Sequence, residues 1–136
     1  MKIIVCLDDR EGMMFNRRRQ SRDRVLIEDV LASMDGGRLC MAEYSSSLFS
    51  ACETPILVRE DFLDVAEEGD TCFVENRTLS AYVEKIQAIT VYRWNRHYPA
   101  DFYFDLKPES MGFRLVEQRE FAGYSHEKIT KEVYVK

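Results

Sequence analysis

The feature that most constrains the fold is the apolar run near the start of the chain. Residues 2–8, Lys-Ile-Ile-Val-Cys-Leu-Asp, hold five apolar side chains in a row, with little alternation of polar and apolar positions. Such a run is typical of a strand buried on both faces, and strands of that kind belong to parallel sheets covered by helices. The opening therefore predicts a central strand of an α/β sheet.

Segments with helical and strand periodicity then follow in alternation. Helical spacing places Ile27, Leu31 and Met34 on one side of a helix expected over 22–34, with Ser21 as its N-cap. A polar loop with Gly12 and Asn16 as turn residues is expected before it. Short strands are expected at 38–42, 55–58, 71–74, 89–94 and 102–104, and helical turns around 44–49, 62–66 and 78–86.

The last third of the chain contains strands alone. The runs 113–121 and 129–135 are separated by a seven-residue link containing Gly123, which predicts an antiparallel hairpin. The second run alternates, with Ile129, Val133 and Val135 on one face and Thr130, Glu132 and Lys136 on the other. We expect one α/β domain over 1–136: a single mostly parallel sheet flanked by helices, with a C-terminal antiparallel hairpin.

Composition narrows the classes of protein. No apolar run approaches the roughly 18 residues that span a bilayer, and no signal peptide is apparent, so we expect a cytoplasmic protein. The four cysteines, Cys6, Cys40, Cys52 and Cys72, form no Cys-x-x-Cys pair, and we interpret them as buried free thiols. With two histidines, the chain lacks the His-x-His-x-Asp-His cluster of a zinc ribonuclease of the ribonuclease Z type, and no metal site is expected.

Charge is distributed unevenly along the chain. The net charge is −5, yet residues 10–24 sum to +4 because they contain six arginines, and 60–75 holds seven acids and no base. Arg17, Arg18 and Arg19, with Asn16 and the start of the following helix, form a candidate anion site. Pairing of these arginines with the acidic 60–75 segment is the alternative.

Local matches, in the same order along the chain, resemble dihydrofolate reductase. The opening strand and 12–16, Gly-Met-Met-Phe-Asn, resemble the family's first strand and its active-site loop. Residues 37–45 lie where the family has a strand ending in Met-Gly-Arg-x-Thr, and 72–74 with 79–85 resemble its strand before a glycine pair and the helix after it. Residues 89–105 and the final hairpin follow the family's last third. The resemblance implies a dihydrofolate reductase-like fold over nearly the whole chain.

The departures from that family concern its cofactor. Its glycine pair lets the backbone approach the pyrophosphate of NADPH, whereas Glu75 and Asn76 stand here. Its Met-Gly-Arg places a cation beside the phosphates, whereas Met-Ala-Glu places Glu43 there. The chain is also shorter between residues 50 and 70, near the adenine side of the family's cofactor site. We therefore expect no bound cofactor.

Other candidate residues carry weaker signals. Asp23 is the nearest match to the acid that protonates the family's substrate, and a first-turn helix acid is the alternative reading. Ser125, His126 and Glu127 are adjacent along the chain, so they cannot form a relay with one another. Candidate ligand-binding residues at the end of the 89–94 strand are Arg93, Asn95 and Arg96.

Three functions follow from these features. The first is a degenerate reductase-like domain that binds a small anion or a partner through its arginine-rich loop. The second is an enzyme on a different, phosphorylated or nucleotide-like substrate, with Asp23 as proton donor. The third is a nucleic-acid-binding accessory protein in which Phe15, Trp94 and Tyr98 stack on bases, although a pI near 5.1 disfavours it.

Overall fold

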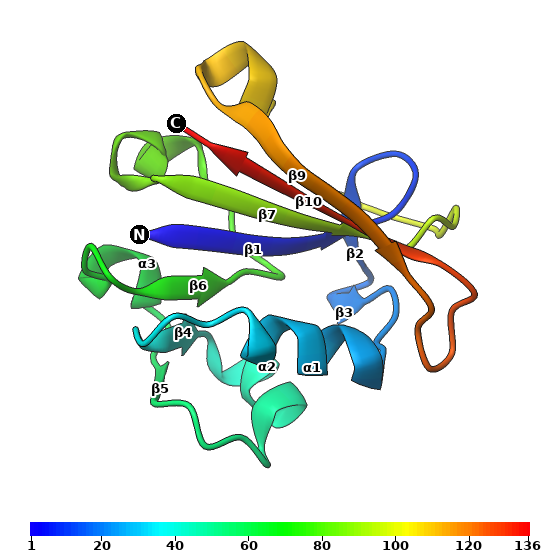
Figure 1. Cartoon of the computed structure of the whole chain (residues 1–136), viewed down its shortest axis with the longest axis horizontal. Coiled ribbons are helices and arrows are strands. Elements are labelled where there is room, and N and C mark those ends of the chain that lie inside the picture. The colour runs from blue at the N-terminus through cyan, green and yellow to red at the C-terminus, as the bar shows by residue number, and fades with distance from the viewer.

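The computed structural model describes residues 1–136 and is organised around a seven-stranded sheet (Figure 1). Its order is β5-β4-β6-β1-β7-β10-β9. The strands are β1 (Lys2–Leu7), β4 (Leu39–Met41), β5 (Ile56–Val58), β6 (Thr71–Phe73), β7 (Ala88–Arg93), β9 (Arg114–Phe121) and β10 (Ile129–Val135). The first five run parallel, and β10 pairs antiparallel with both β7 and β9. The expected parallel sheet with a C-terminal hairpin is confirmed.

A second, small sheet was not expected from the sequence. It has the order β3-β2-β8, with β2 (Gly12–Phe15), β3 (Arg18–Arg19) and β8 (Phe102–Tyr103). Residues 12–19, which we expected as a loop, form a hairpin because Asn16 and Arg17 adopt φ of 51° and 61°. Two successive residues with positive φ make the turn that matches strand twist. Asn tolerates this conformation, whereas Arg rarely adopts it.

Helices are short, and the longest begins later than expected. They are α1 (Arg24–Ala32), α2 (Glu43–Ser46), η1 (Ser47–Phe49), α3 (Phe62–Val65), η2 (Ser80–Lys85) and η3 (Pro108–Met111), where η marks 3₁₀ helices. The N-cap of α1 is Asp23, whose carboxylate accepts from the amides of Val25 and Leu26, so the expected cap at Ser21 is wrong. Leu26 and Val30 form the buried side of α1, and Ile27 is only half-buried.

Apolar side chains cover both faces of β1, as its sequence predicts. Ile3, Val5 and Leu7 join a core beneath α3 and η2, whereas Ile4 joins the core beneath α1. Figure 1 shows β1 in the middle, with β6, β4 and β5 to one side and β7, β10 and β9 to the other. The carboxyl ends of β1, β6 and β7 therefore lie together.

The polar face expected on β10 is largely buried. Of its three residues Thr130 and Glu132 are buried and Lys136 is exposed, and the neighbouring Lys131 is buried as well. Glu132 accepts from Arg93 at 2.9 Å, and the Lys131 ammonium lies 3.1 Å from Asp29 on α1. Alternation predicted the strand correctly but not its surroundings, because buried ion pairs satisfy its charges. No helix has both the length and the apolar character needed to cross a membrane.

Candidate functional site

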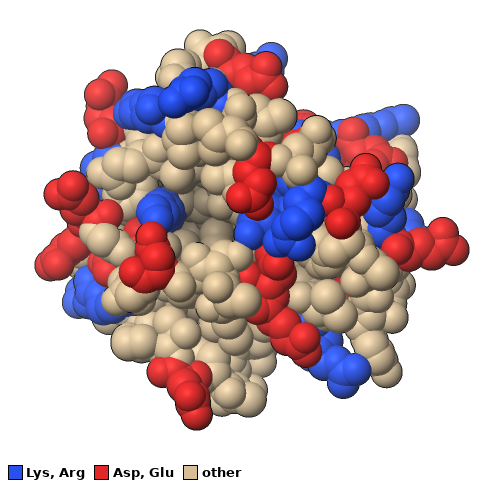
Figure 2. All heavy atoms as spheres, in the orientation of Figure 1, with Lys and Arg blue, Asp and Glu red and all other residues tan.

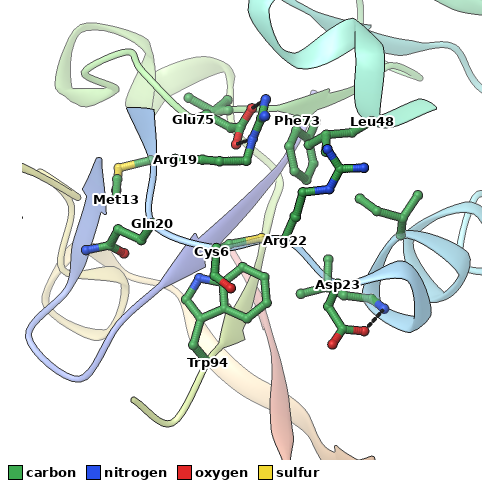
Figure 3. Close-up of a pocket in the computed structure, with 14 residues that line it drawn as sticks. Cys6, Met13, Arg19, Gln20, Arg22, Asp23, Leu48, Phe73, Glu75 and Trp94 are labelled. Atoms are coloured by element: carbon green, nitrogen blue, oxygen red, sulfur yellow. Dashed lines mark hydrogen bonds and ion pairs between the residues drawn. The ribbon is translucent and has the colours of Figure 1, made fainter. Parts of the chain in front are cut away.

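A hollow lies at the carboxyl ends of β1, β6 and β7, against the start of α1 (Figure 3). Its walls are Cys6, Met13, Arg19, Gln20, Ser21, Arg22, Asp23, Leu26, Ile27, Leu48, Phe73, Val74, Glu75 and Trp94. Ligands bind at this edge of open α/β sheets. The cavity volume is about 20 Å³, enough for a single water molecule. The protein's own side chains occupy most of the space.

A partly buried ion pair closes one side of the hollow. The Arg19 guanidinium, from β3, donates two hydrogen bonds to the Glu75 carboxylate, at 2.9 and 3.0 Å. Ser45 donates to the same carboxylate at 2.7 Å, and the guanidinium lies 4.4 Å from the ring centre of Tyr44. Burial acts to lower the pKa of Arg19, but the hydrogen bonds and charge of Glu75 raise it. Figure 3 shows Arg19 extending to Glu75 beyond the end of β6.

Internal carboxylates accept hydrogen bonds from the backbone amides at the start of α2 and of η2. Glu60 accepts from the backbone amide of Glu43, at the start of α2, at 3.0 Å. This bond, with Arg77, lowers the pKa of Glu60. Asp105 accepts from the amides of Leu79 and Ser80, at the start of η2, at 2.9 Å each. Exposed backbone amides at the start of a helix attract anions, and in this chain the anions are the protein's own carboxylates, Glu60 and Asp105.

Asp23 is a fully buried carboxylate with all its acceptor positions in use. It caps α1 and also accepts from the amides of Tyr124 and Ser125, at 2.9 Å each, in the link between β9 and β10. Burial acts to raise the pKa of Asp23, but these amides and His126 lower it far below its usual range. A proton donor needs a pKa near the working pH, so this geometry does not favour Asp23 as an acid.

His126 lies buried between Asp23 and a serine. Its Nδ1 is 2.8 Å from Asp23 Oδ2, and its Nε2 is 3.0 Å from Ser21 Oγ and 3.2 Å from the Tyr98 hydroxyl. Its ring stacks on Trp94 with centroids 4.6 Å apart. Trp94 is 4% exposed, so it cannot stack on a nucleic-acid base as we expected.

The link that carries His126 approaches Asp23 closely because Gly123 has no side chain. A Cβ at Gly123 would lie 2.6 Å from Asp23 Oδ2 and 2.9 Å from Ile129 Cδ1. The residues that meet at Asp23 are about 100 positions apart in the sequence. The sequence of 121–128 does not predict this contact. Its only signal is that a glycine, Gly123, and a histidine, His126, lie close together in one link.

The arginine-rich segment is mostly without carboxylate partners. Of its six arginines, only Arg19 forms an ion pair with a carboxylate, and Arg24 lies over the ring of Tyr124 at 4.1 Å. Arg18 lines an open hollow of about 460 Å³ with Phe15, Asn16, Arg19, Gln20, Tyr98 and Pro99. Arg17 lies at a different hollow with Asn76. The structure thus brings Asn16, Arg18 and Arg19 together and separates Arg17 from them.

The candidate residues at the end of β7 have mainly internal partners. Arg93 pairs with Glu11 at 2.7 Å and with Glu132 at 2.9 Å. Asn95 donates to the carbonyl of Lys128 and to the hydroxyl of Thr130. Arg96 is exposed and lines none of the hollows described above. These contacts join β7 to its neighbours.

Charges of both signs are interspersed over the face shown in Figure 2, with no broad basic area. No group of three or more histidine, cysteine or acidic side chains is arranged to hold a metal ion. All four cysteines are free; Cys40 and Cys72 are buried as expected, whereas Cys6 and Cys52 are only half-buried.

Comparisons with known proteins identify the fold. No family model matches the sequence, and no curated protein matches it. Solved structures do match, among them a dihydrofolate reductase from Enterococcus faecalis complexed with NADP(H) and RAB-propyl, with a TM-score of 0.69 at 9% sequence identity. That match covers 98% of this chain and 94% of the other. The fold expected from the local sequence matches is confirmed.

Proposed function

We propose that this chain, which has a dihydrofolate reductase-like fold, no longer binds NADPH, because the local sequence matches put carboxylates where that family contacts the cofactor phosphates. In its place the domain binds a small anion through Arg18, whose guanidinium has no acid partner. The observation that supports this function best is the combination of an internal Arg19–Glu75 pair with the neighbouring Arg18 guanidinium, which has no acid partner.

Three carboxylates oppose the cofactor, each in a different way. Glu75 stands at the first of the family's two glycines and is held in place by Arg19. Glu43 replaces the family's arginine. The backbone amide of Glu43 already donates a hydrogen bond to Glu60, so it is not free to donate to a phosphate oxygen. A diphosphate placed here meets negative charge and loses its backbone donors. The residues present therefore do not fit NADPH.

The anion proposal relies on Arg18. Its exposed guanidinium, Asn16 and the half-buried Tyr98 line one open hollow, and a guanidinium fork holds phosphate or carboxylate by two parallel hydrogen bonds. Pairing with the acidic 60–75 segment explains Arg19 alone. Arg18 forms no ion pair with a carboxylate, so its guanidinium is available to a ligand.

A thermal-shift assay with inorganic pyrophosphate tests the proposal. A ligand at about 100 times its dissociation constant adds about 2.7 kcal/mol to the free energy of unfolding. Arg18→Gln should raise the dissociation constant of pyrophosphate about tenfold. This factor corresponds to the loss of one hydrogen bond to a charged group, at the lower end of its usual contribution. Arg10→Gln is the matched control, because Arg10 is an exposed arginine of the same segment and does not line the hollow. Equal binding by both variants contradicts the proposed site.

The nucleic-acid alternative has one supporting contact. Phe15 is 41% exposed and lines the same hollow as Arg18, so a base could stack there. This function predicts an affinity for a short oligonucleotide that falls steeply with salt and exceeds the affinity for pyrophosphate. The alternative with Asp23 as a proton donor predicts that Asp23→Asn abolishes turnover of a phosphorylated substrate.

A further inference from the structure

Ser21, His126 and Asp23 form a linear hydrogen-bonded series at the base of the hollow. The distances are 3.0 Å from Ser21 Oγ to His126 Nε2 and 2.8 Å from His126 Nδ1 to Asp23 Oδ2. Both lie in the range that links a nucleophile, its base and the group that orients the base. Ser21 lines the hollow and is half-buried, while the other two side chains are buried behind it.

The direction of the hydrogen bonds follows from Asp23. Its carboxylate accepts from backbone amides at both oxygens, so it stays ionised and can only accept. The Nδ1 of neutral His126 must therefore carry the proton and donate it to Asp23. This leaves Nε2 as an acceptor that faces two hydroxyls, Ser21 at 3.0 Å and Tyr98 at 3.2 Å, and we assign the donated proton to the nearer one, Ser21. A serine in this state is activated for attack on a carbonyl carbon.

We propose that Ser21 is the nucleophile of a second activity of this fold, hydrolysis of small acyl esters, with His126 as general base. Ser21 Oγ bonds to the acyl carbon as its proton passes to His126 Nε2. The alcohol then leaves with that proton. Water attacks the acyl-serine by the same route, releasing the carboxylic acid and restoring Ser21. Asp23 orients His126 throughout. The proposal does not depend on the anion site at Arg18.

Two further features fit this chemistry. The backbone amide of Arg22, the residue after the nucleophile, donates to no acceptor in the protein, and such an amide stabilises the oxyanion of acyl transfer. The cavity beside Ser21, of about 20 Å³, has no room for a long acyl chain. It adjoins an open groove of about 570 Å³ lined by Ile27, Leu31, Leu48, Phe49, Cys52 and Tyr124. The substrate class is accordingly an acetyl ester of a bulky, mainly apolar alcohol.

Hydrolysis of p-nitrophenyl acetate tests the activity. We expect Ser21→Ala and His126→Gln each to lower kcat/KM at least about 100-fold, the lower range for loss of general base catalysis. His97→Gln is the matched control, because His97 is the only other histidine and its side chain is exposed. We expect this substitution to leave kcat/KM nearly unchanged. p-Nitrophenyl octanoate should be hydrolysed more slowly than the acetate. Equal rates for wild type and Ser21→Ala overturn the proposal.

Two measurements on the folded protein remain informative if His126→Gln fails to fold. A fluorophosphonate probe should label Ser21, located by mass spectrometry of peptides, and labelling of other serines with Ser21 unmodified contradicts the assignment. The ¹⁵N chemical shifts of His126 should report a proton on Nδ1 and none on Nε2. A proton on Nε2 contradicts the proposal, since Ser21 then has no base.

Discussion

Replacing Asp23 by asparagine tests the arrangement around its carboxylate most sharply. Asparagine keeps one carbonyl oxygen for the amides of Val25 and Tyr124 but places an NH₂ where Oδ2 now accepts from Ser125. A buried donor without an acceptor costs about 1–3 kcal/mol. We expect Asp23→Asn to lower the free energy of unfolding by that amount and the melting temperature by roughly 4–12 °C.

Urea unfolding measures this change, and Asp35→Asn is its control. Asp35 pairs with Lys2 at 2.9 Å, but its side chain is 69% exposed. An exposed ion pair contributes little, so the control should change stability by less than about 0.5 kcal/mol. Equal effects of the two substitutions would refute the account of Asp23 as a buried acceptor for the hairpin link.

The effect of Asp23 should also depend on pH. Because the folded protein lowers the pKa of Asp23, its ionised form stabilises the fold above the pKa of about 3.9 that an aspartate has when unfolded. This stabilisation is lost as the pH falls through the lower pKa of the folded state. The stability difference between wild type and Asp23→Asn should therefore be constant near neutral pH and shrink below about pH 4.

Three further substitutions test packing and the closed side of the hollow, each by urea unfolding. Leu26→Ala should cost about 2–5 kcal/mol, because Leu26 is 1% exposed, and a loss below about 1 kcal/mol contradicts the buried face assigned to α1. Glu75→Gln should cost about 2–4 kcal/mol, because it leaves the partly buried Arg19 without its acid; an unchanged stability means that the pair is not formed. Gly123→Ala should cost about 1–3 kcal/mol, since a methyl group there overlaps Asp23, and tolerance of alanine disproves that close approach.

Much of the parallel part of the sheet could be predicted from the sequence because its strands are short, mainly apolar runs. Turn conformation and capping were harder. The β2–β3 hairpin depends on a positive φ at Arg17, which arginine rarely adopts, so no residue pattern indicated it. Ser21 and Asp23 are both good N-cap residues two positions apart, and tertiary contacts to the hairpin link decide between them.

The candidate site was predictable only in part. The arginine-rich segment was recognisable from its charge, but its separation into Arg17, Arg18 and the paired Arg19 depends on the hairpin geometry. The contact between His126 and Ser21 joins residues 105 positions apart. A single sequence holds no signal for such a pairing, because each residue has an ordinary local role in a loop.

We propose that internal carboxylates stand where dihydrofolate reductases hold the phosphates of NADPH. Calorimetric titration of the wild-type protein with NADPH tests it directly. We predict no saturable binding with a dissociation constant below about 1 mM, a binding free energy of about −4 kcal/mol. A dissociation constant of about 10 µM or tighter would contradict the account, because Glu43, Glu60 and Glu75 would then have to accommodate a diphosphate.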